Sequence, residues 1–256
     1  MTALLAAALL AAATPVDLRH FRLVDLTHPF GPATLYWPSA PSGFELKAVH
    51  RGLTPGGYFY SAYSFCAPEH GGTHLDAPVH FAAGGRSTEA VPVEQLVAPA
   101  VVIDVTEKAA ADPDYRLAVA DVRAWEARRG PVPAGAIVLL RTGWSARWPD
   151  RKRYLGDDTL GDASKLRFPS YGREAAELLV GERRVGALGV DTASIDHGPS
   201  RDFPVHQVAA AADVPGLENL ARLEELPETG AWLIALPMKI AGGSGGPLRA
   251  VALVPR

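Results

Sequence analysis

Two continuous apolar runs constrain the fold of this chain more than any other feature of its sequence. They are AIVLLRTGW, residues 136–144, and VGALGVDTASI, residues 185–195. Each has the length of a strand, and neither alternates between apolar and polar side chains. Each therefore predicts a strand that is covered on both faces of its sheet.

Other segments complete the pattern of a mixed fold. Short runs bounded by Gly and Pro predict strands within residues 21–30, 58–67 and 100–107. Apolar residues at helical spacing predict helices over residues 117–130 and 172–184, and the first of these segments ends in a glycine. The tail, residues 230–256, predicts two strands joined by a glycine loop. We expect an α/β fold with a mixed β-sheet.

Length and charge favour one globular unit without a polyanionic partner. The chain has 256 residues, 48% of them hydrophobic, and no obvious linker, so one domain with a large core is expected. Its net charge is −3 and its basic residues are scattered, which argues against binding to nucleic acid. Residues 147–172 are charged and lack an apolar period, which predicts a long surface excursion of the kind that often forms a lid.

The N-terminal run MTALLAAALLAAAT, residues 1–14, predicts a signal peptide. It is too short to span a bilayer as a helix and ends in small residues, so we expect no membrane anchor and a periplasmic or secreted protein. No Lys or Arg lies near Met1, which leaves a cytoplasmic protein with an extended start as the alternative.

The stretch EHGGTHLDAPVHF, residues 69–81, predicts a metal site. His74 and Asp76 are two residues apart, so in an extended segment their side chains point the same way. Gly71 and Gly72 allow the backbone to turn so that His70 reaches the same point. Imidazole and carboxylate are usual ligands of a catalytic divalent ion, and three protein ligands leave a position open for water.

A fourth histidine completes this stretch. His80 lies six residues beyond His74, past a proline. It can therefore lie near the metal without ligating it, as a general acid or base.

The same residues resemble a known family. HGGTHLDAPVHF matches the His-X-Gly-Thr-His-X-Asp-Ala-Pro-X-His-Phe signature of the metal-dependent cyclase family, which includes bacterial kynurenine formamidase and isatin hydrolase. The likeness extends through LVDLTHPF, YWP, GVDTASID, FPVHQ and ENL, and so covers almost the whole chain after about residue 22. We expect residues 20–256 to form a cyclase-like hydrolase domain.

The resemblance implies a two-metal centre. His70, His74 and Asp76 would bind one ion, and Asp76 would bridge to a second ion held by His206 and Glu218. The ions would be two Zn²⁺, with Mn²⁺ also possible.

The resemblance also implies roles outside the ligand set. His80 would be the catalytic acid or base, and Trp37 would line the substrate pocket, although ordinary core packing would also explain this tryptophan. The fold would be of the swivelling β/β/α type, and the chain would assemble as a homodimer or tetramer.

Three functions are compatible with these residues. The first is hydrolysis of the C–N bond of a small aryl amide, most like the N-formylkynurenine formamidases of tryptophan catabolism. The second is opening of a cyclic amide such as isatin. The third is an exported module that binds metal or ligand without catalysis, against which the additional base His80 argues.

Several polar residues receive structural interpretations. Ser244 in GGSGG matches the G-x-S-x-G nucleophile elbow, but a strand follows where a helix is required, so we expect a flexible turn that could edge the site. Cys66, the single cysteine, excludes an internal disulfide and is expected to be a buried structural thiol. His28 and His197 are also expected to be structural.

Two aspartates near the later apolar run could support the metal ligands. Asp191 and Asp196 could orient ligand imidazoles as hydrogen-bond acceptors, although aspartate at a strand end is more often a turn or cap residue.

Overall fold

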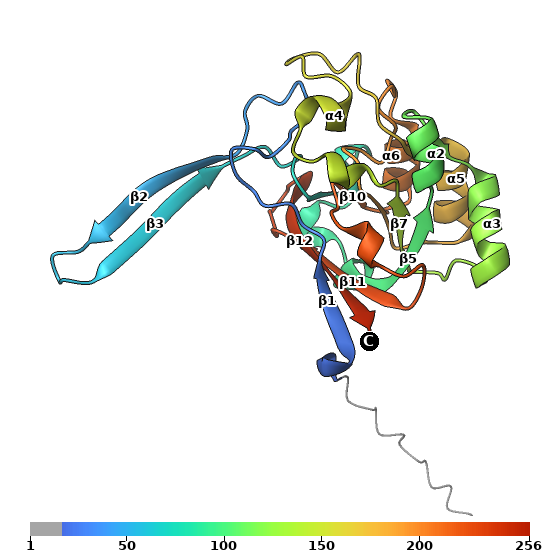
Figure 1. The fold of residues 1–256 in the computed structure, drawn as a ribbon, viewed down its shortest axis with the longest axis horizontal. Helices are drawn as coiled ribbons and strands as arrows, with labels where there is room; N and C mark the ends of the chain where they lie inside the picture. The colour runs from blue at the N-terminus through green and yellow to red at the C-terminus, as the bar shows by residue number, and fades with distance from the viewer. Residues whose placement is uncertain (1–16) are drawn as a thin grey trace, which may run out of the picture.

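The computed structural model describes residues 17–256, and the expected signal peptide, residues 1–14, lies outside them. An eight-stranded sheet forms the body of the molecule, in the order β1-β12-β11-β5-β7-β9-β10-β4 (Figure 1). Its strands are β1 (Phe21–Asp25), β4 (His74–Asp76), β5 (Val97–Asp104), β7 (Ile137–Arg141), β9 (Ala187–Val190), β10 (Gly216–Glu218), β11 (Ala231–Pro237) and β12 (Gly245–Pro255).

An additional pairing closes most of this sheet into a ring. The short strand β4 pairs with β10 on one side and with β12 on the other, so that Asp76 lies opposite both Gly216 and Gly245. Only β1 remains outside the ring, paired with the far end of β12. Strands β5, β7, β9 and β10 run parallel and the other pairings are antiparallel, which confirms the mixed sheet.

Helices cover the outer side of the parallel strands (Figure 1). They are α3 (Val119–Arg129), α5 (Arg173–Glu177), which continues as a π-helical turn (Leu178–Glu182), and α6 (Pro204–Ala211). The described chain also contains α1 (Val93–Leu96), α2 (Thr106–Ala111) and α4 (Arg151–Leu155), and α4 packs in a separate buried cluster. Trp125 of α3, Ala175 of α5 and Val205 of α6 pack in one buried cluster with Val138 and Leu140 of β7. None of the helices within residues 17–256 has the length and apolar character needed to cross a membrane.

The inside of the ring holds a second buried cluster. Alternate residues of the same strands face it, among them Val102 of β5, Leu139 of β7 and Ala187 of β9. The parallel strands are thus buried on both faces, as their continuous apolar sequences predict.

The prediction that residues 147–172 form a surface excursion is wrong for part of the segment. It contains α4 and the short strand β8 (Ser170–Tyr171), which pairs with β6 (Arg116–Leu117). Tyr154, Leu155 and Phe168 are buried in a third cluster with Leu35 and Trp144. Tyr154 and Leu155 lie in the short helix α4 and Phe168 lies in a loop, so their spacing is irregular and a search for helical or strand periodicity misses them.

The strands β2 (Glu45–Leu53) and β3 (Phe59–Cys66) form a hairpin that projects away from the body (Figure 1). They pair only with each other, in a separate two-stranded sheet. Cys66 at the end of β3 is exposed, so its expected role as a buried structural thiol is wrong. The strand was predicted correctly, but it does not pack on the core of its own domain.

Candidate metal centre

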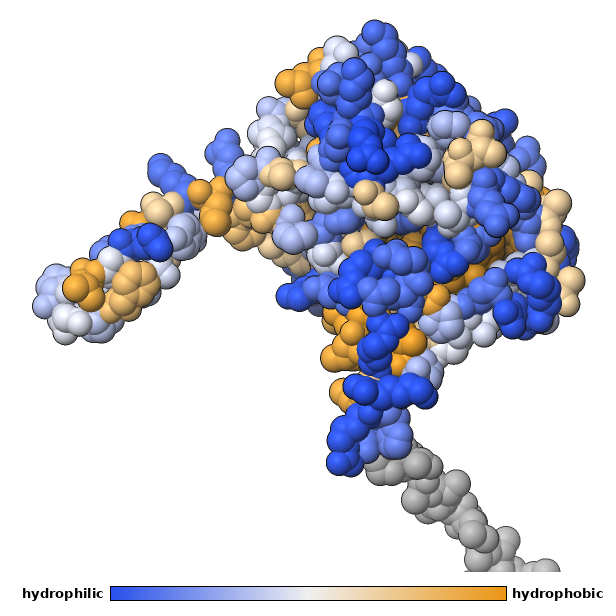
Figure 2. Space-filling model, in the orientation of Figure 1, coloured by the Kyte–Doolittle hydropathy of each residue, from blue (hydrophilic) through white to orange (hydrophobic). Residues whose placement is uncertain are grey.

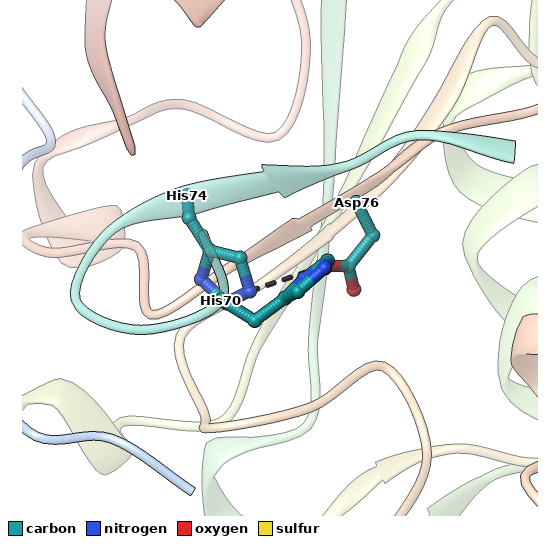
Figure 3. Close-up of side chains that lie close together, drawn as sticks. All are labelled: His70, His74 and Asp76. Carbon is teal, nitrogen blue, oxygen red and sulfur yellow. Dashed lines mark hydrogen bonds and ion pairs between the residues drawn. The ribbon is translucent and has the colours of Figure 1, made fainter. Parts of the chain in front are cut away.

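Strand β4 and the turn before it assemble the first predicted ligand group (Figure 3). His74 and Asp76 extend from the same side of β4, and His74 Nε2 lies 3.1 Å from Asp76 Oδ1. His70 folds back over the turn so that its Nδ1 lies 2.5 Å from the same oxygen. The turn requires glycine at Gly72, where φ is 58° and a Cβ atom would lie 2.6 Å from the Phe30 ring.

Helix α6 and strand β10 supply a second group around the same aspartate. His206 Nε2 lies 3.1 Å from Asp76 Oδ2 and 3.3 Å from Glu218 Oε1. Glu218 Oε2 is also 3.5 Å from His74 Nε2. The five predicted ligands therefore form two three-residue groups that share Asp76.

The buried charged groups of this site shift one another's pKa values. Burial alone would raise the pKa of Asp76, but the three imidazoles hold it well below its ordinary value. Burial would likewise lower the pKa of His74, but the carboxylates of Asp76 and Glu218 outweigh it and raise that pKa to about 9. Burial, together with repulsion from Asp76, raises the pKa of Glu218.

This donor set fits divalent cations. Two carboxylates buried side by side need nearby positive charge, and a divalent ion in each group would supply it without protonating the imidazoles. A group of three nitrogen and oxygen donors suits Zn²⁺ or Mn²⁺ and leaves coordination positions for water and substrate.

Asp196 holds the predicted ligand His206 in place. It accepts a hydrogen bond from His206 Nδ1 at 2.7 Å, and further bonds from the backbone N–H groups of Val205 and His206 at 3.0 Å each. This bond leaves Nε2 facing Asp76, which confirms Asp196 as an orienting acceptor.

Asp191 does not share this role. Its carboxylate instead accepts the backbone N–H groups of Thr142, Gly143 and Trp144, so it is a turn residue.

Ser244 contacts a second predicted ligand, His70, and the sequence did not reveal this contact. Its Oγ lies 2.8 Å from His70 Nε2 and donates to Glu69 Oε2 at 2.7 Å. The GGSGG loop is therefore packed against the site rather than flexible. A Cβ atom at Gly245 would lie 2.5 Å from His70 Cε1, which explains the glycine there. The glycines on either side of Ser244 were the one signal in the sequence for this close approach.

A cavity of about 360 Å³ opens onto both ligand groups. His80 lies in its wall, with its ring stacked on that of His70 at a centroid distance of 3.8 Å. His80 is exposed to solvent, and partial desolvation beside the neighbouring imidazoles lowers its pKa, so the imidazole is neutral near pH 7. Trp37 and Phe203 contribute an apolar wall, with ring centroids 6.1 Å apart, and Trp37 also packs against the buried cluster around Trp144 and Phe168.

The two histidines expected to be structural lie away from this cavity wall. His28 stacks on Trp148 at a centroid distance of 4.3 Å, and burial lowers its pKa to about 4. His197 lies in a separate hollow beside Asp114 and Arg116.

Known proteins share both the sequence pattern and the fold. The family model "Putative cyclase" matches residues 24–197. Isatin hydrolase of Roseibium aggregatum is 39% identical over 196 residues, which are 73% of each chain. Kynurenine formamidase of Sphingopyxis alaskensis is 30% identical over 90% of this chain and 97% of its own. The structure of isatin hydrolase A from Ralstonia solanacearum matches 95% of this chain and 99% of its own with a TM-score of 0.82 and 36% identity. The chain belongs to the cyclase family.

Proposed function

We propose that this protein is a metal-dependent hydrolase that cleaves the C–N bond of a small aryl amide. The observation that carries the proposal is the pair of ligand groups sharing Asp76 at one end of a partly apolar cavity, with His80 beside them. Membership of the cyclase family, and relatives named isatin hydrolase and kynurenine formamidase, support it.

The five ligands would hold two divalent ions, for which we propose Zn²⁺, with Mn²⁺ as the alternative. When bound, such ions activate water and polarise a carbonyl group. Trp37 and Phe203 would bind the aryl ring and keep bulk water away from the amide.

We assign the proton transfer to His80. Its imidazole faces the cavity next to His70 but belongs to neither ligand group. It would accept a proton from the attacking water and deliver it to the nitrogen that leaves, so that the C–N bond breaks with a neutral amine as product.

Two substrates fit this chemistry. The cavity volume of about 360 Å³ lies in the range of small-molecule sites. A cyclic amide of the isatin type is the first candidate, because the isatin hydrolase relative is 39% identical and the formamidase 30%. N-formylkynurenine, which would link the protein to tryptophan catabolism, is the second.

A metal-exchange experiment tests the proposal. The purified protein is analysed for metal, stripped with a chelator and reloaded with Zn²⁺ or Mn²⁺, and the hydrolysis of isatin and of N-formylkynurenine is followed spectrophotometrically. We expect chelation to abolish hydrolysis and reloading to restore it. Stoichiometric metal without hydrolysis of any formamide, lactam or ester in a broad panel would instead identify a non-catalytic binding module.

We also propose that the protein is exported and forms a homo-oligomer. The run at residues 1–14 supports export, and a mass spectrum of the mature protein would show its new N-terminus if a signal peptide is removed. The projecting hairpin supports assembly.

A further inference from the structure

The side chain of Asn219 carries N–H groups that the rest of the described chain does not use. Asn219 follows the predicted ligand Glu218 directly in sequence and lies in the wall of the cavity that opens onto both ligand groups. Its Oδ1 accepts a hydrogen bond from the Tyr154 hydroxyl at 3.0 Å. Within residues 17–256 no acceptor pairs with its Nδ2, so two N–H donors remain for a bound molecule.

The backbone of Asn219 is fixed on both sides. Its N–H donates to the backbone oxygen of Thr192 at 2.8 Å, and its own backbone oxygen accepts from Thr73 Oγ1 at 2.7 Å. Its φ of 54° lies in the left-handed region, which asparagine tolerates better than most residues. The side chain therefore starts from a position that the surrounding structure determines.

Tyr154 fixes the orientation of the Asn219 amide. Burial, together with the negative charges of Asp191 and Glu218, raises the pKa of Tyr154 well above its ordinary value, so its hydroxyl stays a donor. The hydroxyl has one proton, and Asn219 Oδ1 is nearer than its other neighbour, the Asp191 backbone oxygen at 3.2 Å. Because Oδ1 faces this donor, Nδ2 lies on the far side of the planar amide from Tyr154.

The surroundings make these N–H groups selective. Apolar side chains form much of the cavity wall, among them Leu35, Trp37 and Phe203. By contrast, Figure 2 shows a mostly hydrophilic exterior on the visible face of the body. A molecule that enters the cavity leaves water behind, so its polar atoms and the Asn219 N–H groups must pair with each other or stay unpaired.

The two proposed substrates share an oxygen that suits this donor. Isatin and N-formylkynurenine both carry a ketone on the ring carbon next to the one that bears the amide nitrogen. The scissile carbonyl group would face the two ligand groups. The ketone oxygen, an acceptor only, is then the polar atom of the substrate that still needs a donor.

We propose that Asn219 Nδ2 donates a hydrogen bond to a ketone oxygen ortho to the scissile amide nitrogen, so that the cavity selects ortho-acyl anilides and their cyclic forms among small aryl amides. This inference rests on the proposed function and names its substrate class. An analogue without the ketone would displace water from Nδ2 and leave it unpaired, which costs more than the absence of one contact.

Two matched substrates test the selection. N-(2-acetylphenyl)formamide and N-(2-ethylphenyl)formamide differ only in the ketone oxygen, and the ratio of their kcat/KM values measures the preference. Asn219→Gly tolerates the positive φ and should lower this preference by about five- to tenfold relative to the wild type. Comparing ratios cancels the intrinsic reactivity of each compound. An unchanged ratio would overturn the assignment.

A second variant tests the orientation of the amide. Tyr154→Phe keeps the ring but frees the amide, and should lower the same preference, by less than Asn219→Gly does. Tyr171→Phe is the matched control, because Tyr171 is also fully buried and its hydroxyl lies 2.8 Å from the Gly189 backbone oxygen, outside this cavity wall. It should keep the wild-type preference. Equal effects of the two tyrosine substitutions would contradict a role for Tyr154 in orienting Asn219.

A binding measurement separates this inference from the proposed reaction. 2-Aminoacetophenone and 2-ethylaniline differ in the same oxygen, and neither can be hydrolysed. Quenching of tryptophan fluorescence should give a Kd about five- to tenfold lower for the ketone with the wild type, and no such difference with Asn219→Gly. Equal Kd values, or binding of neither compound, would overturn the recognition even if amides are hydrolysed. Discrimination without hydrolysis of any amide would overturn the reaction and leave the role of Asn219 standing.

Discussion

Replacing Asp76 by asparagine should disable both ligand groups at once. The substitution keeps the shape of the side chain but removes its charge, and turns one carboxylate oxygen into an N–H donor. Each group contains three ligands and Asp76 belongs to both, so each would fall to two. Loss of a residue that only orients a metal ligand already costs about 10- to 100-fold in metal affinity. Loss of the shared ligand should cost at least about 100-fold for each ion.

Because both ions would bind more weakly, activity should fall by more than the loss of affinity for one ion would cause. We expect kcat/KM to fall by about a thousandfold or more, which corresponds to about 4 kcal/mol of transition-state stabilisation. Metal content, measured by mass spectrometry after gel filtration, should fall from two ions per chain to less than one.

A matched substitution separates this effect from the general cost of losing a buried aspartate. Asp121 is also buried, at 9% exposure, and belongs to neither ligand group. Its carboxylate accepts a hydrogen bond from Tyr115 and is paired with Lys108. Asp121→Asn should retain its metal and its rate, and circular dichroism should show both variants folded. If Asp76→Asn kept two ions and a rate within tenfold of the wild type, a shared aspartate could not be the centre of the site.

Three further substitutions or modifications test other parts of the structure. Ser244→Ala should weaken metal binding by about 10- to 100-fold in a chelator competition, because His70 Nε2 loses its partner. The kcat at saturating metal should stay near that of the wild type. An unchanged metal affinity would contradict an orienting role for Ser244. Asp191→Ala should destabilise the fold by roughly 3 kcal/mol by leaving buried N–H donors unpaired, and lower Tm by about 5–10 °C in calorimetry; an unchanged Tm would contradict it. Cys66 should react with a thiol reagent in the folded protein as fast as in denaturant, and slow labelling would show that it is covered.

The local part of the metal site could be predicted from the sequence because strand geometry alone brings it together. His74 and Asp76 are neighbours on one side of an extended segment, and the glycines before them return His70 to the same point. His206 is different, since it reaches Asp76 from 130 positions away through the packing of α6 against the sheet. No local pattern encodes that meeting, and only the family resemblance pointed to it.

The errors have a common physical origin. The short run at residues 58–67 correctly predicts a strand, but the same sequence arises whether the strand packs on the core of its own domain or projects from it. Burial of Cys66 therefore could not be inferred. The role of Ser244 was missed because its contact with His70 joins residues 174 positions apart, and a glycine-rich loop has the same sequence whether it is mobile or tightly packed.

The closed ring has a consequence for how the protein would release its metal. Strand β4 contributes two ligands and has hydrogen-bonded neighbours on both sides, β10 and β12. A strand at an open edge can fray and free its side chains at little cost, whereas β4 can separate only by breaking two ladders at once. We therefore expect the Leu75 amide to be among the slowest to exchange with deuterium. Metal loss through local opening of β4 should then be rare.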